Sequence, residues 1–368
     1  MLSVFLAYGQ ENDTGKIKAN YNERIELMSI LCHLAGYQEY NMGMGGDYTT
    51  DIDRYFASVK NHPAVEMMDS LRRYNGVSFD SPMAFAIHLT KAGDDFILTN
   101  DTVATERRWN GVDLKKAVAT ISDFYAKSNF SNFFDSHKPF YEKICSLFNS
   151  NVISKFNQNW YEQFYGMPPT DNFEVVIGFT NVGGNYGPSS QLQGQSRNAY
   201  AIIGYALDDN GEPYYISDPK MYLSTLIHEF NHSFVNPLAD NPEFTSGIES
   251  AGNAMIQYCR KVMRKNAYST WQNLVNESIV MASVIMYLLD NGATEEDIRS
   301  SVIEEMSTGF YWTPELVKCL QYYAANRDRY PTIKSYYPEI IMFFQNYAKN
   351  NMDKIDAIFT ANKSLNNE

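Results

Sequence analysis

The segment Ser217–Pro237, SDPKMYLSTLIHEFNHSFVNP, carries the strongest structural signal in the chain. Asp218 is a favourable N-cap residue, and Pro219 suits the first helical position, where a backbone N–H would lack an intrahelical partner. The pattern therefore predicts a helix that runs to about Val235 and has Pro237 just beyond its end.

The regions around this helix differ in their predicted secondary structure. Upstream, Phe173–Phe179 and Ala199–Ala206 are rich in β-branched and aromatic residues and predict strands, and Pro213–Ile216 predicts a third. Elsewhere apolar residues recur at helical spacing. We expect an α+β, mostly helical fold, with a small β-sheet packed beside the helix of Ser217–Pro237 and flanking helical regions. The other predicted helices cover 25–35, 63–76, 82–89, 112–125, 139–148, 247–265 and 270–289.

The composition indicates an ordered globular protein, with 44% hydrophobic residues, 27 Tyr and 22 Phe. A net charge of -13 and the lack of a basic run argue against nucleic-acid binding. No segment approaches 18 uninterrupted apolar residues, so we expect no transmembrane segment. The four cysteines are Cys32, Cys145, Cys259 and Cys319. They form no CxxC pair and lie in apolar helical contexts, which favours a role as small buried residues over a cysteine zinc site. A disulfide between two of them stays open.

His228 and His232 are four residues apart, so they share one face of the predicted helix and can bind one zinc ion together. Glu229 projects beside the metal position, where a general base for a zinc-bound water belongs. With six histidines in the chain, an HExxH pattern arises by chance in roughly one such chain per hundred or two. The alternative is a helix whose two histidines are merely buried or half-exposed.

A catalytic zinc site usually has three protein ligands and leaves the fourth position to water. A third histidine six residues after His232 is ruled out, because Leu238 stands there. Glu277, on a later predicted helix, is the favoured third ligand, since a carboxylate among apolar residues needs a partner such as a metal. Glu249 and Asp240 are the alternatives, both in polar contexts.

The pattern His228-Glu229-x-x-His232 followed by Asn276-Glu277 resembles the gluzincin zinc metallopeptidases, over about 110 residues from the first predicted strand onward. The resemblance implies two histidine ligands and one glutamate ligand, Glu229 as the base, and a strand edge along which a peptide can pair. Met281 stands where the best-known members have an Asp, four residues after the ligand Glu, that orients the first histidine.

The chain as a whole, including Glu23–Leu27 and His62–Val65, is also similar to a bacterial family of unknown function, which implies a link to secretion. Four regions are expected. Residues 1–10 are apolar and read as a residual signal segment, so we expect export to the periplasm or the extracellular space, with a cytoplasmic location as the alternative. The other regions are an N-terminal helical region at 11–166, a zincin-like metallohydrolase core at 167–292 and a C-terminal helical region at 293–368.

Together these residues predict a zinc-dependent hydrolase, a metallopeptidase, that acts on a peptide or protein substrate. Zinc would activate a water molecule, and Glu229 would carry its proton to the leaving amine. A donor for the developing oxyanion is also needed. Tyr311, Tyr322, Tyr323 and His62 are candidates, although packing explains each of them more readily. The alternative functions are a non-catalytic exported binding protein and a degenerate metallopeptidase that keeps a structural metal.

Overall fold

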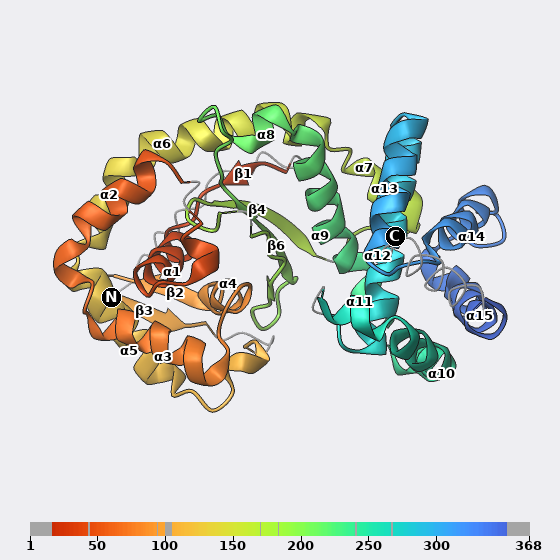
Figure 1. Cartoon of the computed structure of the whole chain (residues 1–368), viewed down its shortest axis with the longest axis horizontal. Coiled ribbons are helices and arrows are strands. Elements are labelled where there is room, and N and C mark those ends of the chain that lie inside the picture. The colour runs from red at the N-terminus through yellow and green to blue at the C-terminus, as the bar shows by residue number, and fades with distance from the viewer. Residues whose placement is uncertain are drawn as a thin grey trace, which may run out of the picture. The chain divides into compact units, whose positions relative to one another are not determined.

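The computed structural model describes residues 17–42, 45–93, 95–99, 105–169, 171–182, 184–239, 241–265 and 268–351. The predicted signal segment at 1–10 and the alternative ligand Asp240 lie outside these residues. The fold is α+β and mostly helical, as predicted (Figure 1). The chain forms two compact units. Unit 1 comprises Met1–Gln158, Phe173–Gln193 and Tyr200–Pro219, and unit 2 comprises Asn159–Asn172, Gly194–Ala199 and Lys220–Glu368.

A four-stranded sheet of order β1-β4-β6-β5 lies largely in unit 1. Its two longer strands, β4 (Asn172–Gly178) and β6 (Asn198–Gly204), confirm two of the predicted strands within a residue or two. The edge strands are short: β1 (Ala19–Asn20), which runs parallel to β4, and β5 (Ser189–Ser190). The residues of β6 after Asn198 are buried, as expected for a strand covered on both faces.

Helices make up most of the remainder of unit 1. A hairpin that the sequence did not predict, β2 (Leu89–Ala92) with β3 (Asp95–Leu98), interrupts them and packs on α5. The helices are α1 (Glu23–Leu34), α2 (Asp47–Tyr55), α3 (Pro63–Asn75), α4 (Ser81–Ala86), α5 (Leu114–Lys127), α6 (Phe130–Asn151) and α8 (Tyr214–Ser217).

Two predictions in unit 1 were wrong. The segment predicted as a third strand, Pro213–Ile216, lies mostly in the short helix α8. Ile216 N–H donates to the Pro213 carbonyl (2.8 Å), and Asp218 N–H donates to the Tyr214 carbonyl (2.7 Å). The helix predicted to begin at Pro139 is the middle of α6, which begins at Phe130. Proline favours a first turn, but long helices tolerate it where packing supports both sides, and the residues of α6 that are buried lie on either side of Pro139.

Unit 2 is built from helices that pack on α12 (Trp271–Asp290). Helices α10 (Pro242–Tyr258), α13 (Glu295–Ser307) and α14 (Thr313–Ala325) contact α12 directly, and α15 (Ile333–Asn350) contacts α10 and α14. A capping box of Thr294 with Asp297 begins α13. The unit also contains α7 (Asn159–Tyr165), α9 (Pro219–Ala239) and α11 (Arg260–Lys265).

The predicted helix bounds in unit 2 needed two corrections. Helix α9 begins at Pro219, as expected, but continues through Pro237 to Ala239. A proline in the last turn removes only one intrahelical hydrogen bond, so it does not have to mark the end. The helix predicted over 247–265 begins earlier, at Pro242, and breaks at Cys259 into α10 and α11.

Helix α12 is the core helix of unit 2. Among the described residues it alone is long and apolar enough to cross a membrane, but 67% of its most apolar window is buried inside the unit, as in the core helix of a globular protein. Ser278 on α12 accepts a hydrogen bond from the indole N–H of Trp312 (2.8 Å), which is fully buried. The four cysteines, all in the described part of the chain, are free, and three of them are buried.

Candidate metal site

Helix α9 is held by aromatic residues of α7, also in unit 2. The Tyr161 hydroxyl donates to the Ile227 carbonyl (3.1 Å), and the Tyr165 hydroxyl donates to Asn231 Oδ1 (2.7 Å). The ring of Tyr165 stacks on that of Phe234, with centroids 4.4 Å apart. Because Ile227, Asn231 and Phe234 are buried, they fix one face of α9. The two histidines of the motif occupy a half-buried face of the same helix.

Helix α12 brings the third residue of the site. Thr270 caps its N-terminus by accepting a hydrogen bond from the backbone N–H of Asn273 (3.2 Å). Glu277 follows two turns later and precedes Ser278, whose side chain is tied to Trp312. The Glu277 backbone is therefore fixed within the core of the unit, while its side chain, 17% exposed, points to His228 and His232.

The three predicted ligand residues converge. Nε2 of His228 lies 3.2 Å from Nε2 of His232, 3.4 Å separates His228 Nε2 from Glu277 Oε2, and 3.7 Å separates His232 Nε2 from Glu277 Oε1. One ligand atom from each residue lies within 4.8 Å of the other two. Zinc–nitrogen and zinc–oxygen bonds of about 2.0 to 2.2 Å in a tetrahedron place ligand atoms roughly 3.3 to 3.6 Å apart, so the cluster has the spacing that such an ion requires.

Two further observations fit a cation at this position. His232 Nδ1 lies 3.0 Å from Asn236 Oδ1, and an Nδ1–H that donates to this oxygen would leave the Nε2 lone pair for a metal. Glu277 Oε2 is buried and accepts no hydrogen bond of good geometry. A buried carboxylate oxygen without such a donor is costly unless a cation faces it. The orienting Asn236, one turn after His232, could have been found from its spacing.

The charges of the cluster are strongly coupled. Burial alone would lower the pKa of His228, but Glu277 and, to a smaller extent, the charges of Glu229 and Glu305 raise it to about 9. Burial alone would raise the pKa of Glu277, but its polar interaction with His228 and the charge of His232 outweigh that effect and lower it. The site thus stabilises positive charge between the two helices, which suits a metal cation as well as a proton.

Two residues of this cluster were missed in the sequence. Tyr268, which precedes the cap of α12, hydrogen-bonds to the Glu277 carboxylate, and its pKa is raised by burial and by the charges of Glu277, Glu305 and Glu229. Glu305, near the end of α13, has a pKa raised to about 7 by burial, with the His228 charge acting in the opposite direction. No local motif marks either residue, because tertiary packing and not sequence spacing decides which side chains act on the histidines.

The other candidates from the sequence lie elsewhere. Glu249 is an exposed residue of α10, and it is not part of the cluster. Tyr323 is buried and donates its hydroxyl to the Phe164 carbonyl (2.7 Å), so it serves packing. Tyr322 is 49% exposed, and Tyr311 is half-buried. His62 belongs to unit 1, where its Nδ1 accepts the N–H of Ala64 (3.1 Å) at the start of α3.

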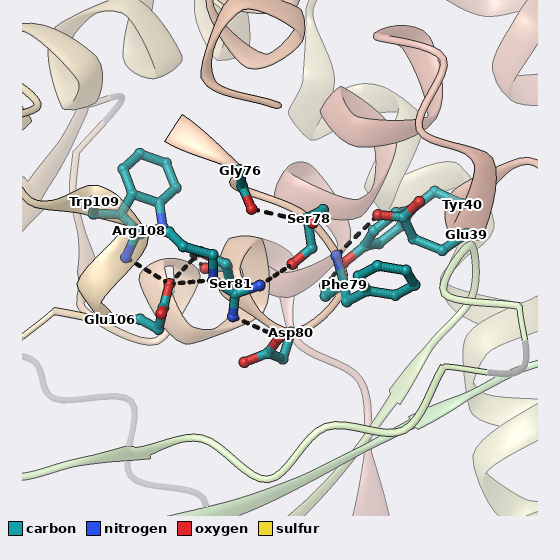
Figure 2. A network of polar contacts seen from close by, with 10 residues as sticks. All are labelled: Glu39, Tyr40, Gly76, Ser78, Phe79, Asp80, Ser81, Glu106, Arg108 and Trp109. Atoms are coloured by element: carbon teal, nitrogen blue, oxygen red, sulfur yellow. Dashed lines mark hydrogen bonds and ion pairs between the residues drawn. The ribbon is translucent and has the colours of Figure 1, made fainter. Parts of the chain in front are cut away.

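A second polar cluster lies in unit 1 around Arg108 (Figure 2). Its guanidinium donates to Asp80 (2.6 Å), to Glu106 (2.8 Å) and to the Ser78 carbonyl (2.9 Å), and Ser81 Oγ donates to Glu106 (2.6 Å). A cavity of about 300 Å³ borders Asp80 and Glu106. Since Arg108 already neutralises both carboxylates, the cluster is explained as a tie between the start of α4 and the segment before α5.

Comparison with known proteins gives a family but no activity. No curated protein matches the chain, and no solved structure does. The family described as "Domain of unknown function (DUF4932)" matches residues 17–343, which include all the residues of the cluster. This agrees with the similarity to a family of unknown function that the sequence indicated, and the chain belongs to that family.

Proposed function

We propose that this protein is a zinc-dependent hydrolase that cleaves peptide bonds, with His228, His232 and Glu277 as the metal ligands. The observation that supports this most strongly is that one ligand atom of each residue lies within 4.8 Å of the other two. Two imidazoles and one carboxylate form a donor set used by catalytic zinc sites, and they leave a coordination position for water. Bound there, zinc would lower the pKa of a water molecule and polarise a carbonyl group.

Glu229 is the residue to which we assign the general base. It follows His228 on α9 and is half-buried, and its charge contributes to the raised pKa of His228. Its carboxylate is therefore near the cluster without being one of the three grouped ligands. In this role it accepts a proton from the attacking water and passes it to the leaving amine.

Tyr268 is the residue to which we assign the oxyanion donor. Burial together with the charges of Glu277, Glu305 and Glu229 raises the pKa of its hydroxyl, which therefore keeps its proton, as a donor must. The choice of peptides over other carbonyl substrates rests on the resemblance to gluzincins, which the order of His228, Glu229, His232 and Glu277 carries.

The experiment that tests the proposal uses the full chain loaded with zinc and a mixture of unrelated peptides followed by mass spectrometry. The Glu229→Gln variant should keep the zinc and lose hydrolysis, by about a hundredfold or more. The matched control is Glu249→Gln on the exposed face of α10, which should hydrolyse as the wild type does. If Glu229→Gln remains fully active, the assigned base is wrong. If the wild type binds zinc and cleaves no peptide, the metal is structural.

A further inference from the structure

Three polar residues follow one another along one row of α9, each a turn after the last: His228, His232 and Asn236. Side chains four residues apart lie one above the other on a helix, and each of them leans toward the helix N-terminus. The amide of Asn236 therefore reaches back to the ring of His232, and Asn236 Oδ1 lies 3.0 Å from His232 Nδ1. Because the first two residues of the row are the proposed metal ligands, the third would act on a metal only through His232.

The backbone that carries Asn236 is held in place by its neighbours. Val235 is 1% exposed and Leu238 is 7% exposed, so buried side chains anchor the last turn of α9 on both sides of Asn236. Asn236 itself is half-buried, and a hydrogen bond that is partly shielded from water holds a side chain more firmly than an exposed one does. The amide thus joins a fixed backbone to the side chain of a metal ligand.

The far side of the His232 ring shows what this contact accomplishes. Its Nε2 lies 3.2 Å from His228 Nε2 and 3.7 Å from Glu277 Oε1. A neutral imidazole carries one N–H and one nitrogen lone pair. An accepting oxygen at Nδ1 favours the proton on that nitrogen, which leaves the lone pair on Nε2, where the other two ligand residues converge.

We propose that Asn236 is a positioning residue that holds His232 in the tautomer with its proton on Nδ1, and that its neutral amide leaves the metal site positively charged. This inference rests on the metal ligands of the proposed function. A carboxylate in the place of the amide would make the same hydrogen bond but would raise the basicity of the imidazole. With the amide, a divalent ion bound by two neutral imidazoles and Glu277 keeps about one positive charge, which strengthens its pull on a carbonyl oxygen.

The test compares two substitutions of similar size in the full-length protein. Asn236→Leu removes the acceptor, whereas Asn236→Asp keeps an accepting oxygen and adds a negative charge. In competition with a chelating dye, Asn236→Leu should weaken the Kd for zinc by about tenfold or more, and Asn236→Asp should tighten it by roughly threefold or more. A role in packing alone would weaken zinc binding in both variants. Asn253, an exposed residue of α10, supplies the matched controls Asn253→Leu and Asn253→Asp, which should both bind zinc as the wild type does.

A second measurement reads the tautomer of His232 without any metal. Long-range proton–nitrogen NMR spectra of the metal-free protein with isotope-labelled histidine are recorded at a pH high enough to leave the ring neutral. The wild type and Asn236→Asp should carry the proton of His232 on Nδ1, and Asn236→Leu should move it to Nε2, the form that free histidine favours.

Three results would overturn the inference: Asn236→Asp weakens zinc binding as much as Asn236→Leu does, Asn236→Leu leaves the Kd unchanged, or His232 of the wild type carries its proton on Nε2. Failure of the proposed function looks different. A wild type that binds zinc and cleaves no peptide contradicts the hydrolase alone, because the opposite effects of the two Asn236 variants on the Kd would persist. A wild type that binds no zinc contradicts both.

Discussion

Glu26 gives the most quantitative prediction for this protein, because it is a buried acid and no cation among the described residues contributes to its pKa. It lies in α1, is 1% exposed, and accepts hydrogen bonds from the Tyr48 hydroxyl (2.7 Å) and the backbone N–H of Phe179 (3.2 Å). Burial raises its pKa from 4.5 to about 7, and the two hydrogen bonds offset this only in part. Glu26→Gln removes the ionisable group and keeps both contacts, since the Gln amide can donate to the Tyr48 oxygen and its carbonyl can accept from Phe179.

The sign of the effect follows from proton binding. Between the unfolded pKa of 4.5 and the folded pKa of about 7, the folded protein holds a proton that the unfolded chain has released. The free energy of unfolding therefore falls as the pH rises through this window, and the contribution of Glu26 is complete below it. A shift from 4.5 to about 7, at 1.36 kcal/mol per unit, gives a loss on the order of 3 kcal/mol.

The assay is urea unfolding of the wild type and Glu26→Gln at pH 5 and pH 8. Because pH 5 already lies above the unfolded pKa of 4.5, the wild type should lose about 2.5 kcal/mol more than the variant does between pH 5 and pH 8. Glu66→Gln, at an exposed position of α3, should behave as the wild type. Equal losses for the wild type and Glu26→Gln would refute the claim that burial governs this carboxylate.

Three more predictions concern single residues. Tyr268→Phe should lower kcat by roughly a hundredfold and leave the zinc content unchanged, whereas a loss of zinc would make Tyr268 a residue that positions Glu277. His62→Ala should cost about 1 kcal/mol of unfolding free energy through the lost cap of α3, and any loss of peptide hydrolysis at equal folded protein would restore it as a site residue. Gly166→Ala should lower the free energy of unfolding by at least about 2 kcal/mol, because Gly166 has φ +70° and a Cβ there would clash with the Pro331 carbonyl oxygen. Chemical denaturation measures this loss, and an unchanged denaturation midpoint would contradict it.

The three ligand residues could be predicted because each of them has a strong local signal in the sequence. His228 and His232 needed only a helix to share a face, and a capping pattern made that helix easy to recognise. Glu277 stood out as an isolated carboxylate in the apolar run of α12, which is buried around it. The spacing of these residues along the sequence does not predict the 3.4 Å between His228 Nε2 and Glu277 Oε2, because that distance depends on how α9 and α12 pack.

Features that depend on tertiary contacts were not predictable from the sequence. Tyr268 and Glu305 carry no motif, and the chain has 27 tyrosines among which to choose. The hairpin of β2 and β3 is short, and its strands alternate too briefly for period-two patterning to stand out against helical spacing. The packing of the sheet against the helix of the motif stays a prediction, as do the four regions of the chain and its export.

The most direct test of the central claim is the zinc affinity of the purified full-length protein, measured by competition with a chelating dye. The wild type should bind one zinc ion per chain, and Glu277→Ala should weaken its Kd by at least about a hundredfold, while Glu249→Ala, on an exposed face of α10, should leave it unchanged. A wild-type protein that binds no zinc, or a Glu277→Ala variant that binds zinc as tightly as the wild type, would contradict the assignment of this cluster as a metal site.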